Sequence, residues 1–99
     1  MRIVLDAMGT DNAPGVDVEG AVRAARAFGQ EIVLVGREND IRAELARHDT
    51  AGLPLSVVHA GQVIEMREHP SQAVRAKPDS SMVVGMRLLR EGKANAFVS

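Results

Sequence analysis

The chain has 99 residues, of which 25% are charged, and a formal net charge of -1. This near-neutral charge gives no argument for nucleic-acid binding, and two aromatic residues, Phe28 and Phe97, are too few to stack the bases of a single strand. Because cysteine is absent, the chain has no disulfide framework, no thiolate metal site and no cysteine nucleophile. No stretch resembles a signal peptide or approaches membrane-spanning length, so we expect a cytoplasmic protein.

The chain opens with an apolar strand followed by an amphipathic helix. Ile3–Leu5 has the length and β-branched content of a buried parallel strand. A helix is predicted from about Val16 to Phe28, and Gly29 is expected to end it. Its apolar face has three- and four-residue spacing and consists of Val18, Ala21, Val22, Ala25 and Phe28.

The same alternation continues through two further strands and a helix. Ile32–Val35, closed by Gly36, is predicted as the second strand, and Leu55–His59 as the third. Between them, Asn39 or Asp40 is expected to cap a helix. This order predicts an α/β fold with three α/β/α layers, a mostly parallel sheet and helices on both faces.

A helix and a strand are predicted near the end of the sequence. Asp79 or Ser80 is expected to cap a helix that extends to about Arg90, with Gly92 just beyond its last turn. A fourth strand is predicted at Ala96–Val98. The face of the helix that enters the core is expected to carry Met82, Met86 and Leu89.

The stretch between these parts has a weaker pattern. Residues 61–70 are expected to form a long loop and residues 71–76 a short helical piece. Glu65 in this loop is either an acid–base group or an exposed carboxylate. No metal site is expected, because the histidines lie in different segments without carboxylates at ligand spacing; they are His48, His59 and His69.

Two polar segments are candidates for binding an anion. The first is the loop Asp6–Pro14, since the backbone N–H groups of a loop between a strand and a helix are donors that suit a phosphate. Its structural alternative is that Asp6 caps a turn and Gly9 relieves a backbone angle. The second is Lys77–Met82, where a lysine, two hydroxyls and a helix start come together. Its alternative is an ordinary helix cap preceded by a solvated lysine.

Together these segments resemble the bacterial phosphate acyltransferases of phospholipid synthesis, the PlsX family. Asp6–Pro14 is similar to the family's D-A-M-G-G-D-x-A-P start. Val63–Met66, Lys77–Met82 and Glu91–Ser99 resemble its V-I-x-M, K-x-D-S-S-M and E-G-x-A-D-A-x-V-S segments, in the same order. The resemblance covers the whole chain, and because family members are several times longer, it implies an N-terminal portion of a larger enzyme.

Two positions depart from the family pattern. Thr10 stands where the family has a second glycine, and a β-branched residue would be strained there if the site requires a positive φ. Asn12 stands where histidine is common, so no role for an imidazole is carried over to it.

The resemblance implies that inorganic phosphate attacks the fatty acyl thioester of an acyl carrier protein. It implies no metal or organic cofactor, a homodimer, and peripheral association with membranes through parts outside this chain. The competing hypothesis is a non-catalytic α/β lobe that binds a phosphate-bearing ligand or a protein partner. The residues expected to bind phosphate or substrate are Asp6, Gly9, Thr10, Asp11, Lys77, Ser80 and Ser81.

Overall fold

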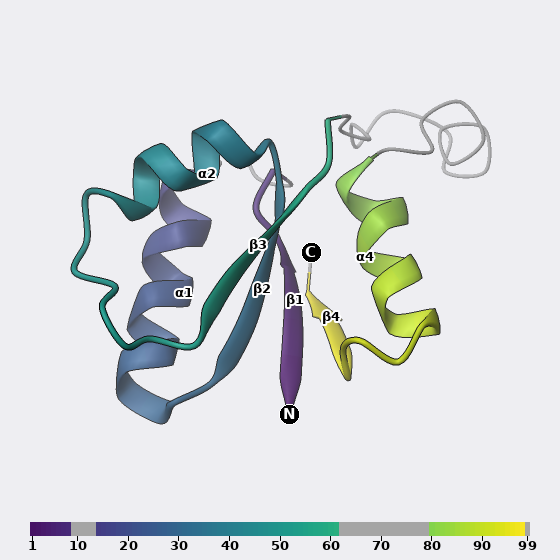
Figure 1. Ribbon diagram of the computed structural model, residues 1–99, viewed down its shortest axis with the longest axis horizontal. Coiled ribbons are helices and arrows are strands. Elements are labelled where there is room, and N and C mark those ends of the chain that lie inside the picture. The colour runs from purple at the N-terminus through teal and green to yellow at the C-terminus, as the bar shows by residue number, and fades with distance from the viewer. Residues whose placement is uncertain (9–13, 62–79, 99) are drawn as a thin grey trace.

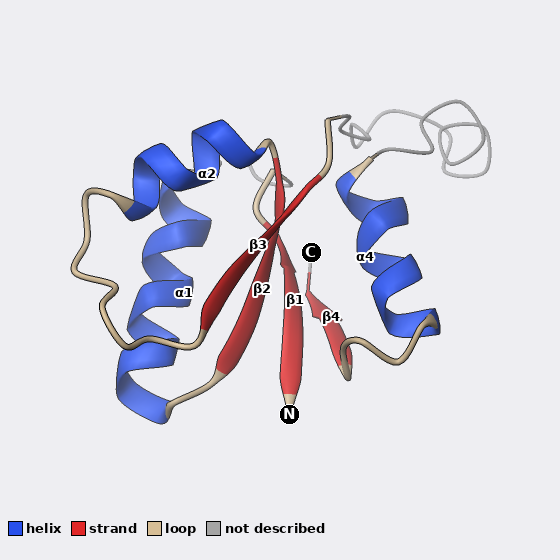
Figure 2. Cartoon of the chain, viewed as in Figure 1, coloured by secondary structure: helices blue, strands red, loops and turns tan. Residues whose placement is uncertain are grey.

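The computed structural model describes residues 1–8, 14–61 and 80–98 (Figure 1). In this part of the chain, four parallel strands form one sheet in the order β3-β2-β1-β4, and three helices cover it. Figure 2 shows the strands side by side with helices to both sides. The elements are β1 (Arg2–Asp6), α1 (Gly15–Phe28), β2 (Glu31–Gly36), α2 (Glu38–Leu45), β3 (Leu55–His59), α4 (Ser81–Arg90) and β4 (Ala96–Val98).

Side chains alternate between two cores along the strands. Leu5 and Leu34 lie in the core under α1 and α2, whereas Val4 and Val33 lie in the core under α4. This alternation follows from the two-residue period of a strand, and it confirms the predicted three-layer α/β/α arrangement with a parallel sheet. The expected bounds of the third and fourth strands agree with β3 and β4.

Two predictions about the helix faces are wrong. Phe28 is 84% exposed, because α1 ends there and Gly29, with φ of 65°, turns the chain toward β2. Met86 is 52% exposed, whereas Val84 and Gly85 are buried against the sheet. The buried face of α4 is therefore rotated away from the predicted one, since small residues allow the helix to approach the sheet closely.

The predicted cap of the second helix is also wrong. Asn39 and Asp40 lie inside the first turn of α2, and the N-cap position is Arg37. The backbone N–H of Glu38 donates instead to Nδ1 of His59, at 3.2 Å. This acceptor comes from the end of β3, so no local capping signal predicted where α2 begins.

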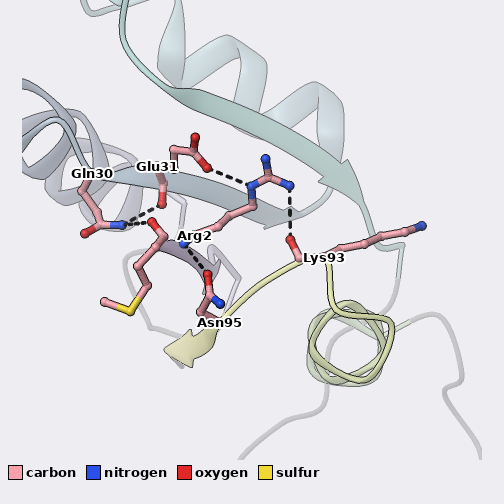
Figure 3. A network of polar contacts seen from close by, with 6 residues as sticks. Arg2, Gln30, Glu31, Lys93 and Asn95 are labelled. Carbon is pink, nitrogen blue, oxygen red and sulfur yellow. Dashed lines mark hydrogen bonds and ion pairs between the residues drawn. The ribbon is translucent and has the colours of Figure 1, made fainter.

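A polar network ties the strands together at the amino edge of the sheet (Figure 3). Arg2 N–H donates to Oδ1 of Asn95 and Asn95 N–H donates to the Arg2 carbonyl, both at 2.8 Å. The Arg2 guanidinium lies 3.1 Å from the Glu31 carboxylate and also donates to the Lys93 carbonyl. The network joins β1 to the segments beside it on both sides.

None of the described helices is long and apolar enough to cross a membrane.

Candidate functional site

All three described helices begin at the carboxyl edge of the sheet, opposite the polar network (Figure 1). The first N–H groups of a helix have no partner within the helix and carry a partial positive charge. In α1 and α2 this charge is partly offset by acidic residues of the first turn, which are Asp17 in α1 and Glu38 and Asp40 in α2. The first turn of α4 itself has no acidic residue, although Asp79 precedes its N-cap in the sequence and lies outside the described residues.

Ser80 forms the start of α4. It has extended backbone angles, φ of −74° and ψ of 154°, and its Oγ accepts a hydrogen bond from Val83 N–H at 3.2 Å. Its side chain is fully buried, and Ser81 is only 1% exposed. Of the two predicted caps, Ser80 is thus the one that caps this helix. A hydroxyl that accepts one hydrogen bond can still donate its own proton, so the cap does not use up the hydrogen-bonding capacity of Ser80.

Asp6 ends β1 at the same edge and is 5% exposed. Its Oδ1 accepts a hydrogen bond from Met8 N–H at 2.9 Å, which is the local turn that aspartate side chains stabilise. The turn-capping alternative raised from the sequence is therefore present. This hydrogen bond fixes the backbone that follows Asp6, and a direct contact of Asp6 with phosphate stays a prediction.

The structure brings Asp6, Ser80 and Ser81 to one edge of the sheet. This agrees with the expectation that loops following parallel strands meet at the carboxyl ends. The other residues predicted to bind phosphate or substrate lie outside the described residues: Gly9, Thr10, Asp11 and Lys77. The predicted loop at 61–70 and short helix at 71–76 are also outside them, apart from Gly61.

His59 also lies at this edge, at the end of β3, and the sequence pattern assigns it no function. It ends β3 and accepts the hydrogen bond from Glu38 N–H that begins α2. Only its position at the end of a predicted strand could have indicated such a role. Within residues 1–8, 14–61 and 80–98, no three histidine, cysteine, aspartate or glutamate side chains are grouped to hold a metal ion.

Comparison with known proteins gives consistent matches along the whole chain. A family profile described as "Fatty acid synthesis protein" matches residues 1–99. The phosphate acyltransferase of Herpetosiphon aurantiacus is 60% identical over 99 residues, which are 100% of this chain and 27% of that protein. The phosphate acyltransferases of Geobacter sp. strain M21 and Geobacter sulfurreducens are 54% and 52% identical over all of this chain and 28% and 29% of their own lengths. The chain thus spans less than a third of the length of these curated relatives.

Proposed function

Because this chain belongs to the fatty acid synthesis protein family, we propose that it is the N-terminal part of a phosphate acyltransferase. The observation that carries the proposal is the identity of 52% to 60% with three proteins of that name, which extends over the whole chain. The helix start at Ser80, with no acidic residue in the first turn of α4, supplies a plain physical reason for an anionic substrate.

The proposed reaction transfers a fatty acyl group from acyl carrier protein to inorganic phosphate. A phosphate oxygen forms a bond to the thioester carbonyl carbon, and the carbon–sulfur bond breaks. The products are an acyl phosphate and the carrier thiolate, which takes up a proton. Phosphate is a good nucleophile near neutral pH, so the protein needs to hold it beside the carbonyl and stabilise the oxyanion that develops.

The described residues contribute position and charge to this reaction. The N–H groups at the start of α4, with the hydroxyls of Ser80 and Ser81, are proposed to bind the phosphate oxygens. Asp6 shapes the turn at the end of β1. Gly9, Thr10, Asp11 and Lys77 remain proposed binding residues, on the basis of the family's motifs. No metal ion or organic cofactor is needed for these steps.

The same resemblance supports further properties of the parent enzyme. We propose that it acts in the cytoplasm as a homodimer and takes acyl carrier protein as its partner. Peripheral contact with the membrane, where its product is used in phospholipid synthesis, would involve parts of the parent outside these residues.

The test is an assay of the full-length protein with a long-chain acyl carrier protein and inorganic phosphate. Free carrier thiol and acyl phosphate, the latter trapped by hydroxylamine, are both measured. The expected result is equal amounts of the two products, formed only when phosphate is present. If phosphate binds but no phosphate-dependent thiol is released, the proposal fails, and the non-catalytic binding lobe becomes the better description.

A further inference from the structure

The side chain of Met8 occupies the space directly above Gly36 at the carboxyl edge of the sheet. A Cβ atom built on Gly36 would lie 2.5 Å from Cγ of Met8, 3.0 Å from its Sδ and 3.1 Å from Cδ1 of Ile41. The glycines with a positive φ in the described chain are Gly29, Gly52 and Gly92, so the backbone angle of Gly36 does not require glycine. The reason for glycine at this position is therefore space for Met8.

Met8 is connected to the candidate site through its backbone. Its N–H donates to Oδ1 of Asp6 at 2.9 Å. The preceding N–H, that of Ala7, donates to the carbonyl of Val35 at 2.9 Å, one residue before Gly36. Two contacts therefore join the end of β1 to the end of β2. One is the hydrogen bond from Ala7 to Val35, and the other is the packing of the Met8 side chain against Gly36. The buried Asp6 carboxylate takes its orientation from the same turn.

We propose that Met8 and Gly36 form a positioning pair that sets the turn at Asp6 for the use of phosphate. The inference rests on the proposed function, because its readout is the phosphate dependence of the acyl transfer. Neither residue is assigned a contact with substrate. A methyl group on Gly36 would displace the Met8 side chain. Because the Met8 N–H donates to Asp6 Oδ1, the proposal is that this displacement passes through the Met8 backbone to the turn at Asp6.

The experiment compares variants of the full-length protein in steady-state assays at varied phosphate concentration. Gly36→Ala is expected to raise the KM for phosphate at least tenfold while changing the KM for the acyl carrier protein less than twofold. In a Met8→Ala background, adding Gly36→Ala is expected to change the phosphate KM less than twofold, because the clash has been removed. Ile41→Val removes only the contact between Cδ1 of Ile41 and the added methyl group. In that background, Gly36→Ala should still raise the phosphate KM at least fivefold.

Gly20→Ala is the matched control, since a Cβ on Gly20 meets nothing within 4 Å, and it should leave the phosphate KM unchanged. If Gly36→Ala lowers the melting temperature but leaves the phosphate KM at its parental value, the pair is only a packing contact and the inference is overturned. An equal effect of Gly36→Ala with and without the Met8 side chain would also overturn it. If Gly36→Ala alone does not fold, the Met8→Ala variant decides. A folded Met8→Ala protein with a raised phosphate KM and an unchanged KM for the acyl carrier protein supports the pair, and a parental phosphate KM contradicts it. A wild-type protein without acyl-phosphate formation would instead reject the proposed function.

Discussion

The ring of Phe97 lies directly against the backbone of Gly85, where β4 and α4 meet. A Cβ atom on Gly85 would lie 1.9 Å from Cε2 of this ring, so the two elements can approach only because position 85 has no side chain. Gly85→Ala is therefore expected to destabilise the full-length protein by about 1–3 kcal/mol or more, the usual cost of overpacking a core. The measurement is the shift of the urea-unfolding midpoint.

Two companion variants separate the clash from a general effect of alanine. Gly20→Ala lies within α1 and lines the apolar groove beside β1, where an added Cβ meets nothing within 4 Å, so it should not reproduce the loss caused by Gly85→Ala. Phe97→Leu combined with Gly85→Ala should recover part of the loss. If Gly85→Ala were as stable as the parent protein, the close contact between Gly85 and the Phe97 ring would be contradicted.

A second prediction concerns Asn95, whose Oδ1 accepts the N–H of Arg2 at the amino edge of the sheet (Figure 3). Asn95→Ala should cost about 0.5–1.5 kcal/mol, because β1 loses a hydrogen bond beside β4. Asn95→Asp should cost less, since a carboxylate oxygen can accept the same N–H. Urea unfolding of both variants checks this, and equal losses would indicate that the hydrogen bond contributes nothing.

A third prediction concerns the 99 residues produced alone. They should form no acyl phosphate above a control without protein, since the proposed reaction needs the rest of the parent enzyme. They should also self-associate, because an apolar groove of about 320 Å³ lies open between α1 and the β1–β4 side of the sheet. Val16 and Val98 in its lining are 56% and 48% exposed. A single monomeric species in sedimentation would contradict the predicted self-association. Acyl-phosphate formation by the 99 residues would contradict the predicted lack of activity.

The fold could be predicted from the sequence wherever local pattern and tertiary structure agree. The apolar runs at Leu55–His59 and Ala96–Val98 define β3 and β4, and Gly29 ends α1 in the left-handed conformation expected of a terminal glycine. Ser80 is a cap because serine before a helix satisfies a nearby N–H, which is a local property.

Features that depend on distant contacts could not be predicted in this way. The start of α2 follows from His59, which lies 21 positions away. The buried face of α4 follows from the fit of Gly85 to Phe97, and a pattern of large apolar residues pointed instead to Met86. The contact between Met8 and Gly36 also joins two strands, so it has no sequence signature of its own. For the candidate site, local pattern was enough to place Asp6 and Ser80 at the carboxyl edge and to offer the turn that Asp6 stabilises, whereas binding of phosphate there stays a prediction.

We propose that phosphate binds at the start of α4, and variants of Ser80 separate phosphate binding from helix stability. Ser80→Ala removes the cap and the hydroxyl, and it should cost about 1 kcal/mol of stability. Ser80→Gly removes the same hydroxyl at only a few tenths of a kcal/mol, because glycine is tolerated at this position. Arg90→Ala, in the last turn of the same helix, is the control and should be nearly neutral.

The most direct measurement is the initial rate of acyl-phosphate formation against phosphate concentration for these three variants of the full-length protein. Ser80→Ala and Ser80→Gly should both lower kcat/KM for phosphate by roughly 5- to 30-fold, equivalent to about 1–2 kcal/mol, despite their different stabilities. Arg90→Ala should keep the parental value. If both Ser80 variants fold and retain the parental dependence on phosphate, Ser80 is a helix cap alone and the phosphate binds elsewhere.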